Sequence, residues 1–537
     1  MKKRTTNPIY LVVVILVAAV LSFSFWNLPS LKKQSSHSFN TDNVLQDIQV
    51  ISQERHSVIH PQARAQVRDY LVSRLQSLGS EPRIYHADSL EARSYVFDID
   101  NIVADFPAEG CETYLLMVAH YDSRYPWVPV KDTTCSYGAA DDGYGVGVIL
   151  ETVSQALQHR ESWKQGLRVI FTDAEEVGMI GMKTLYNNHK ELFNDVGLMI
   201  NIEARGPYGP ALLFETSPGA DKILKFYTKN SRQHHTYSLT NVVYSFLPNF
   251  TDFTIVKDSI PGMNFSAIAD INHYHTTLDN FSNVSKSTID HYGAQIAPLV
   301  IEYLTAEEYG DKDYFRNGKD RTFFTVPVLG MFDFSKTAYL ILNIVLILLM
   351  LITILLDRCS ISKLLKGAGI TLGFAVAAIA FGLLATWLGC LMSGAAFKPF
   401  GIITGMMFDN ALMIVCAIAV AALIAWYSYK HQDKEILYGT YLAVAVLCIA
   451  LLAAIGETML FMVVFAFSVI AVFLWKLTDW KIFLLAGVAL SCLHMFSFLY
   501  SLAMALTVGA VGAVLFIMVF DLMMVLPLCV SYLKNQR

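Results

Sequence analysis

The sequence predicts an α/β globular domain followed by an all-α membrane domain with about seven transmembrane helices. Hydrophobic residues make up 54% of the 537 residues and charged residues only 16%, whereas a soluble domain has about 25% charged residues. The charged residues are concentrated before residue 336, so a polar part is joined to an apolar part. We expect a transmembrane anchor over residues 1–30, a globular domain over 31–333 and a membrane domain over 334–537.

Short apolar runs alternate with helical stretches in the globular part. The runs that predict buried strands are Tyr114–Ala119, Leu167–Phe171, Gly197–Ile202 and Met263–Ile268. Strands that are apolar on both faces and alternate with helices are typical of a largely parallel sheet with helices on both sides. Ahead of them, helical spacing predicts one helix over Asn43–Leu78, ended by Gly79.

The apolar half contains seven runs, each near the ~20 residues that a membrane-spanning helix needs. They are Thr337–Leu356, Ala368–Ser393, Asn410–Tyr429, Ile436–Ile455, Thr458–Trp475, Ile482–Tyr500 and Val508–Leu533. Most basic residues of this half lie in alternate connections between the runs. The positive-inside rule then predicts that these connections are cytoplasmic and that the globular domain is extracytoplasmic. Inside the runs, the ionisable residues are His494 and Asp521, which we interpret as helix-packing residues.

A further apolar run spans Ile9–Trp26 and follows Lys2, Lys3 and Arg4. A cleaved signal peptide would have a shorter apolar core and small residues at its end, whereas this run ends in large aromatic residues. We therefore expect an uncleaved anchor with its N-terminus in the cytoplasm, and eight spans in total.

The globular part carries more acidic than basic residues. A nucleic acid is therefore excluded as a partner, because phosphate binding needs a basic surface. The eight cysteines are scattered, and Cys111 and Cys135 lie on either side of a predicted strand. A strand of about six residues spans ~20 Å, so these two cysteines are not expected to form a disulfide.

Ionisable residues follow each predicted strand or begin the next helix. They are His120 and Asp122 after the first strand, Asp141 and Asp142 before the helix that follows, Glu175 and Glu176 after the second strand, Glu203 after the third, and His275 and Asp279 after the fourth. Each motif alone could be a turn, a helix cap or a surface pair. Ligands bind outside the carboxyl ends of strands in open α/β sheets, and zinc takes imidazole and carboxylate ligands. Together the motifs predict a metal site.

As a set, these motifs resemble metallopeptidase family 28, the co-catalytic zinc aminopeptidases. The motifs are His120-x-Asp122, Gly138-Ala-x-Asp141-Asp142-Gly143, Glu175-Glu176-x-Gly178, Glu203 and His275-Thr-x-x-Asp279, and the resemblance covers about residues 40–305. The apolar second half is similar to that of the membrane-bound branch of the family. The resemblance implies a three-layer zinc-exopeptidase fold with a mixed, largely parallel sheet. Tyr144, where the family has a small residue, and Glu203, where many soluble members have Asp, leave the substrate preference open.

The resemblance also implies a role for each residue. Asp141 would bridge two zinc ions. His120 and Glu203 would complete the ligand shell of one ion, and Glu176 and His275 would complete that of the other. Glu175 would be the general base. Asp122 and Asp279 would orient the ligands, and the Asp141–Asp142 peptide would be cis. The metal shell does not explain Arg205, which could contact the substrate, although a salt bridge to a nearby acid is the interpretation that we slightly prefer.

These roles predict a membrane-bound di-zinc aminopeptidase that acts on peptides with a free N-terminus. One alternative is an acyltransferase similar to glutaminyl cyclase, which uses a single zinc ion. Another is a receptor or transporter whose globular domain has lost catalysis. The five-ligand set favours two metals over one, and Glu175 favours an enzyme, because a structural metal site needs no base.

Overall fold

The computed structural model describes residues 8–23, 39–92, 94–125, 135–246, 249–403, 406, 408–431 and 434–534. The chain divides into two compact units. The α/β unit comprises residues 25–325 and 331–335, and the helical unit comprises residues 1–24, 326–330 and 336–537.

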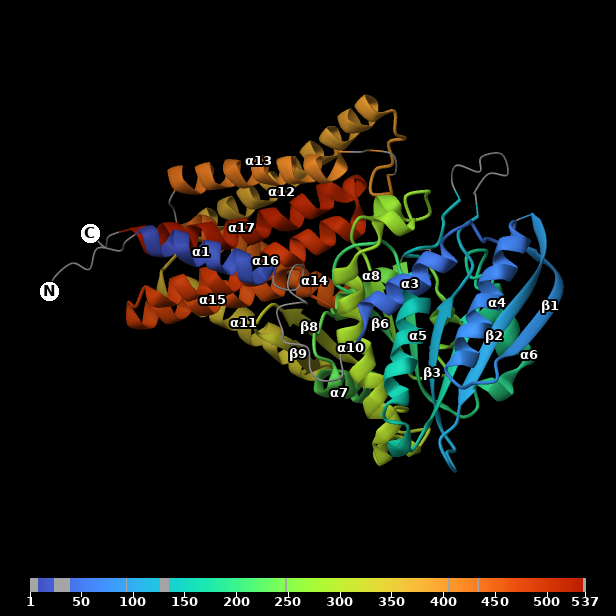
Figure 1. Ribbon diagram of the computed structural model, residues 1–537. Helices are drawn as coiled ribbons and strands as arrows, with labels where there is room; N and C mark the ends of the chain where they lie inside the picture. Colours follow the sequence, from blue (N-terminus) through green and yellow to red (C-terminus); the bar gives the residue numbers. More distant parts are fainter. Residues whose placement is uncertain are drawn as a thin grey trace. The chain divides into compact units, whose positions relative to one another are not determined.

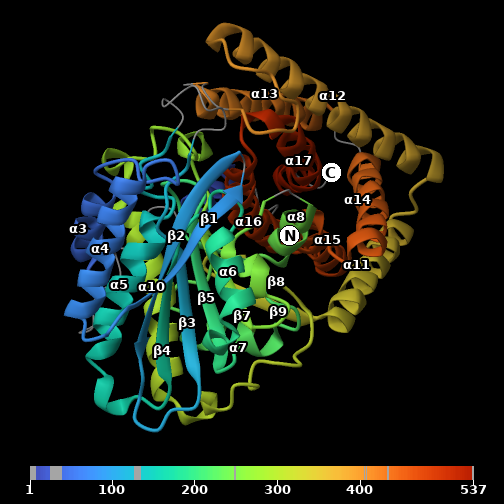
Figure 2. The same ribbon diagram turned by 90° about the vertical axis from the view of Figure 1, so that its right-hand side faces the viewer.

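A seven-stranded sheet with the order β1-β2-β4-β3-β5-β7-β6 forms the centre of the α/β unit (Figure 2). The strands are β1 (Arg83–Ala92), β2 (Tyr95–Phe106), β3 (Tyr114–His120), β4 (Gly166–Thr172), β5 (Val196–Ala204), β6 (Leu212–Thr216) and β7 (Gly262–Ala267). The central strands β4, β3, β5 and β7 are parallel, and β1, β2 and β6 pair antiparallel with their neighbours. Two further strands, β8 (Arg321–Val326) and β9 (Gly330–Ser335), form a separate pair.

Helices cover both faces of the large sheet. One face packs against α3 (Thr41–Ile51), α4 (Pro61–Ser77), α5 (Gly143–Leu157), α7 (Asp221–Asn230) and α10 (Lys286–Thr305), and the other against α6 (Ile180–Asn188) and α9 (Asp252–Val256). Helix α8 (Ser238–Phe246) lies beside β6. Side chains of β3 alternate between the two cores: Leu115 and Met117 join the first, and Leu116 and Val118 the second. The predicted mixed, largely parallel α/β fold is confirmed.

The prediction of one helix over Asn43–Leu78 is wrong, because the structure has two helices, α3 and α4. Pro61 has no N–H to donate and stands in the first turn of α4, where that donor is not needed. The chain leaves α3 at Ser52, whose N–H bonds to the Ile48 carbonyl oxygen at 3.0 Å. The predicted end at Gly79 is correct: its φ is +90°, and its N–H donates to the Gln76 carbonyl oxygen at 2.9 Å.

The outer strands β1, β2 and β6 were absent from the prediction. Continuous apolar runs indicate strands that are buried on both faces, such as β4, in which every residue is buried. Strand β6 is also buried throughout, but it has only five residues and ends in Glu215 and Thr216, so its apolar run is too short to stand out. Strand β1 instead consists of exposed and half-buried residues, so it carries no such run.

The helical unit contains seven helices that are long and apolar enough to span a membrane, among the residues that the structure describes. They are α11 (Lys336–Leu356), α12 (Ile361–Ser393), α13 (Asp409–Lys430), α14 (Lys434–Ile455), α15 (Met459–Thr478), α16 (Ile482–Leu506) and α17 (Val511–Leu533) (Figure 1). They correspond to the seven predicted runs. Helix α12 starts before its predicted run, because Lys363 and Lys366 interrupt the apolar pattern without interrupting the helix.

The N-terminal apolar run forms the shorter helix α1 (Pro8–Ser22), and the end of the predicted anchor falls outside the described residues. Helix α1 packs against α16. The Ser497 N–H donates to the Ser22 hydroxyl oxygen at 2.9 Å, and the rings of Phe23 and Tyr500 meet edge to face.

Candidate metal centre

The parallel strands bring the predicted ligands to one edge of the sheet. His120 is the last residue of β3, and Glu203 is the last but one of β5. Glu176 follows the end of β4, and His275 follows β7. Asp141 lies in the turn before α5. Because β3, β4, β5 and β7 are parallel, their carboxyl ends lie at the same edge, where ligands bind in this class of fold.

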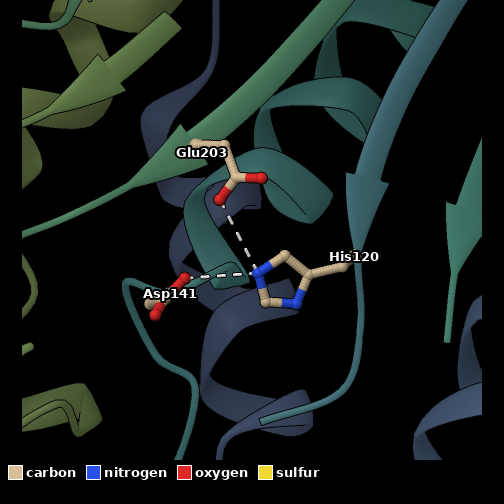
Figure 3. A group of neighbouring side chains, drawn as sticks. All are labelled: His120, Asp141 and Glu203. Atoms are coloured by element: carbon tan, nitrogen blue, oxygen red, sulfur yellow. Dashed lines mark hydrogen bonds and ion pairs between the residues drawn. The ribbon is translucent and has the colours of Figure 1, made fainter. Parts of the chain in front are cut away.

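The first ligand group consists of His120, Asp141 and Glu203 (Figure 3). His120 Nε2 lies 3.2 Å from Asp141 Oδ1 and 3.7 Å from Glu203 Oε2. In Figure 3 both carboxylates point at this nitrogen from two different segments of the chain. One atom from each of the three side chains lies within 4.8 Å of the others, so a single ion can contact all three.

The second group consists of Asp141, Glu176 and His275. His275 Nε2 lies 3.3 Å from Asp141 Oδ2 and 3.2 Å from Glu176 Oε2. Asp141 therefore presents Oδ1 to the first group and Oδ2 to the second. This is the arrangement of a carboxylate that bridges two metal ions.

The polar atoms of these residues fit metal ions better than they fit one another. Asp141 Oδ2, Glu176 Oε1 and His275 Nε2 are buried and have no hydrogen-bond partner among the described residues. Buried polar atoms are nearly always paired, so unpaired atoms that face one another indicate a missing ligand. Carboxylate oxygens and imidazole nitrogens are common zinc ligands, and both groups therefore fit zinc.

The electrostatics of the site also indicate a cation. Burial raises the pKa of Glu203 well above its usual value, and the neighbouring Asp142 and Asp141 carboxylates raise it further. Burial also raises the pKa of Glu175, with Glu203 as the next cause. A bound divalent cation would keep these carboxylates ionised, because an opposite charge favours the charged form.

A model of peptidase family M28 matches residues 101–300, the segment that contains β3 and all five proposed ligands. This region belongs to peptidase family M28. Among relatives, the chain is 26% identical over 398 residues to a vacuolar membrane protease of Kluyveromyces lactis, covering 67% of this chain and 41% of that protein. It is 25% identical over 255 residues to endoplasmic reticulum metallopeptidase 1 of Mus musculus, covering 47% of this chain and 27% of that protein.

This chain covers less than half the length of the vacuolar membrane protease and of the endoplasmic reticulum metallopeptidase that it resembles. A solved structure of a Zn-dependent exopeptidase from Parabacteroides distasonis aligns with a TM-score of 0.40 and 21% identity, covering 49% of this chain and 98% of that one.

Asp122 supports the M28 site at two points. The ring Nδ1 of His120 lies 2.9 Å from the Asp122 carbonyl oxygen and 3.5 Å from its carboxylate. That carboxylate also accepts the backbone N–H groups of Glu175 at 2.9 Å and Glu176 at 3.3 Å. Asp122 therefore orients a proposed ligand, mainly through its backbone carbonyl oxygen, and its carboxylate fixes the turn that carries the proposed base.

Asp279 lies at the site, but the contacts of its carboxylate differ from those expected for a residue that orients a ligand histidine. It accepts the Ser136 hydroxyl and the Ala140 N–H, both at 2.6 Å, and the Asp141 N–H at 3.4 Å. Asp279 thus holds the turn that carries the bridging Asp141. The peptide bond between Asp141 and Asp142 is cis, as expected.

Tyr144 is fully buried. Its hydroxyl donates to the Pro207 carbonyl oxygen at 2.7 Å and accepts the Ser285 N–H at 2.8 Å. The large side chain therefore ties the start of α5 to two loops.

Sequence reasoning did not identify Arg124 and Tyr274. Arg124 Nη1 donates to the Glu176 carboxylate at 2.8 Å and to the Glu176 carbonyl oxygen at 2.6 Å. Burial raises the pKa of Glu176, but His275 and Arg124 more than reverse this, so the pKa lies below its usual value. Tyr274 stacks on His275, with ring centroids 3.5 Å apart. Arg124 lies two residues after Asp122, and Tyr274 directly precedes His275. Their closeness to these motif residues is the sequence feature that could have identified them.

Arg205 is half-buried, and its backbone N–H donates to the Ala267 carbonyl oxygen at 2.8 Å. In the described part of the chain its guanidinium has no ion pair, so the salt bridge considered from sequence is not present there. Burial, Asp141 and Glu176 raise the pKa of the Tyr274 hydroxyl, and the charge of Arg205 opposes them. The charge of Arg205 therefore acts on Tyr274, which stacks on the proposed ligand His275.

Proposed function

We propose that this protein is a membrane-bound di-zinc aminopeptidase that hydrolyses N-terminal residues from peptides. The observation that carries the proposal is Asp141, whose two carboxylate oxygens face two separate groups of donors. His120 and Glu203 would complete one zinc site, and Glu176 and His275 the other. Zinc held there would polarise the scissile carbonyl and make a water more acidic.

Glu175 is the residue that we assign as general base. It is buried beside the ligands, and its backbone N–H is fixed by Asp122. Its carboxylate would take a proton from the attacking water and pass it to the leaving amine, which is general acid–base catalysis at one side chain. Glu176, the next residue, is occupied by Arg124 and faces His275, so the two neighbours serve different tasks.

The substrate class follows from the charge of the site. The Asp142 and Glu175 carboxylates add negative charge beside the five proposed ligands, three of which are carboxylates themselves. A free α-amine is a cation at neutral pH and is attracted to such a site, whereas a substrate carboxylate is repelled.

The direct test is an assay of the full chain in detergent with a panel of aminoacyl fluorogenic substrates, before and after a chelator. We expect hydrolysis that the chelator abolishes and added zinc restores. A peptide with N-terminal Gln distinguishes the cyclase alternative. Release of free glutamine supports an aminopeptidase, and formation of pyroglutamyl peptide without release of an amino acid would contradict it.

We also propose the orientation of the helical unit. Basic residues gather in alternate connections, including Lys363 and Lys366 before the apolar part of α12, and Lys476 and Lys481 between α15 and α16. The positive-inside rule places these connections in the cytoplasm and the α/β unit outside it. A reporter inserted at Asp479 should read as cytoplasmic, and one inserted at Gly394 as extracytoplasmic. The opposite pattern would overturn the orientation.

A further inference from the structure

A cavity of about 780 Å³ opens at one end of the helical unit. It lies where α13, α15 and α17 end and where α14 begins. Pockets that bind small molecules commonly have roughly 300–1,000 Å³, so the cavity can hold a ligand of that size. It is far in sequence from every residue of the proposed metal centre, and the proposed function gives it no role.

The charged lining of the cavity has an excess of positive groups. Four lysines line it, Lys434, Lys476, Lys481 and Lys534, against two acids, Asp357 and Glu435.

Both acids already have partners. Asp357 Oδ1 lies 2.8 Å from Lys476 Nζ and 3.9 Å from Lys434 Nζ. Glu435 pairs at 3.5 Å with Lys363, which is not a lining residue. Two lysines therefore share the single charge of Asp357, and the lining as a whole is cationic.

Some of the lysine N–H groups bind helix ends, and others remain available to bind an anion. Lys481 Nζ donates to the carbonyl oxygens of Tyr532, at 2.8 Å, and Lys534, which lie at the end of α17. These oxygens carry only partial negative charge. Burial lowers the pKa of Lys481, which means that its surroundings do not fully compensate its charge. An ammonium group has three N–H donors, so Lys476 and Lys481 retain donors for an anion.

The rest of the lining is apolar and includes Ile436, Val472, Pro527 and Leu528. A cavity lined by both ammonium groups and aliphatic groups matches a phosphate joined to a glycerol and acyl chains. We propose that this cavity binds the phosphate of an anionic phospholipid headgroup, with Lys434, Lys476, Lys481 and Lys534 as the cationic ligands. A basic pocket between transmembrane helices on the cytoplasmic side is a recurrent site for such headgroups.

The proposal is tested on the full chain in detergent by native mass spectrometry and thermal unfolding with added phosphatidylglycerol or phosphatidylcholine. The wild-type chain should retain phosphatidylglycerol under conditions that remove phosphatidylcholine, and its Tm should rise only with the anionic lipid, because a ligand of the folded state stabilises it. This comparison needs no variant. Equal retention of the two lipids would overturn the proposal.

A pair of double variants locates the site. Lys481→Gln/Lys534→Gln removes two lining charges and leaves the Asp357 pairs in place. Lys366→Gln/Lys430→Gln removes the same charge from the same end of the unit, at residues that do not line the cavity. We expect the first variant to lose roughly tenfold or more in lipid affinity, and the second to match the wild type. Equal losses in both would overturn the site, since general surface charge would then explain the binding.

A soluble phosphate ester distinguishes a lipid headgroup from a soluble phosphate as the ligand of the cavity. Glycerol 1-phosphate at millimolar concentration should neither displace phosphatidylglycerol nor raise the Tm. If it does both as strongly as the lipid, a soluble phosphate is the ligand and the lipid proposal fails.

Discussion

The two units of this chain differ most in what they bury. In the α/β unit, buried carboxylates and imidazoles converge: His120, Asp141 and Glu176 are each less than a tenth exposed, and Asp141 shares one ligand group with His120 and the other with Glu176. Two of the buried ionisable groups of the helical unit, His494 and Asp521, have no charged partner among the described residues, and His494 stacks on Phe498. Burying a charge is costly unless it has a partner. The difference supports our proposals that catalysis belongs to the α/β unit and that the helical unit supplies location and contact with lipid.

The largest expected effect comes from the proposed base. Glu175→Gln should lower kcat by roughly 10²–10⁴-fold, because the amide cannot accept the proton of the attacking water. Metal content should stay at the wild-type level, since Glu175 belongs to neither ligand group.

The matched control is Glu151→Gln, which alters another buried glutamate of the same unit. Its carboxylate accepts the Asn40 N–H at 3.0 Å and the Asn43 side chain at 2.9 Å, away from the site. This variant should keep its turnover. Near wild-type kcat in Glu175→Gln would show that the base is another residue.

A smaller effect is expected at Arg124, which donates to the carboxylate of the proposed ligand Glu176 at 2.8 Å. Arg124→Met should weaken zinc binding roughly 10–100-fold, as loss of a group that orients a ligand commonly does. Turnover should recover at saturating zinc. Arg68→Met is a suitable control, because Arg68 pairs with Asp69 and Asp100 instead. Zinc titration followed by activity measures both, and an equal zinc requirement in the two variants would contradict the role of Arg124.

A more modest effect is expected from pH. Burial lowers the pKa of His235 to about 4 and that of His291 to about 3, while an unfolded histidine titrates near 6.5. The unfolded state therefore binds more protons in this interval, and the free energy of unfolding should fall as the pH drops from about 6.5 toward 4.

The measurement is the Tm of the full chain between pH 7.5 and 4.5, beside that of His291→Asn. The variant lacks one of the two groups, so its Tm should fall less than that of the wild type. Parallel curves would show that His291 makes no contribution to acid sensitivity.

The smallest effect is expected in the helical unit. Asp521→Asn and His494→Gln should leave the turnover of small aminoacyl substrates unchanged, because neither residue contacts a proposed ligand. Steady-state kinetics in detergent measures this. A large loss of kcat in either variant, with zinc content intact, would contradict the proposal that the helical unit takes no part in catalysis.

The sequence predicted what depends on local pattern. Strands β3, β4, β5 and β7 are apolar on both faces, and each is followed by ionisable residues, so both the parallel sheet and the gathering of His120, Asp141, Glu176, Glu203 and His275 could be expected. The interruption between helices α3 and α4, just before Pro61, was not predicted, because the apolar residues keep helical spacing on both sides of it. The exposed strand β1 carries no apolar run.

The remaining differences depend on contacts between distant segments. Asp279 binds the Ser136–Asp141 segment, and Arg124 reaches the Glu176 side chain, across 138 and 52 positions of sequence respectively. Residue type and spacing do not specify such partners. They arise only when the ends of several strands are placed side by side.

The most direct test of the central claim is to measure zinc content and turnover in a soluble fragment of residues 34–333, beside the full chain in detergent. A fragment of ~300 residues can bury about three quarters of its unfolded surface, so it has enough core to fold alone. The account predicts a folded fragment that binds two zinc ions and cleaves aminoacyl substrates with the kcat of the full chain. A folded, zinc-loaded fragment without activity would contradict it, because the helical unit would then be needed to complete the site.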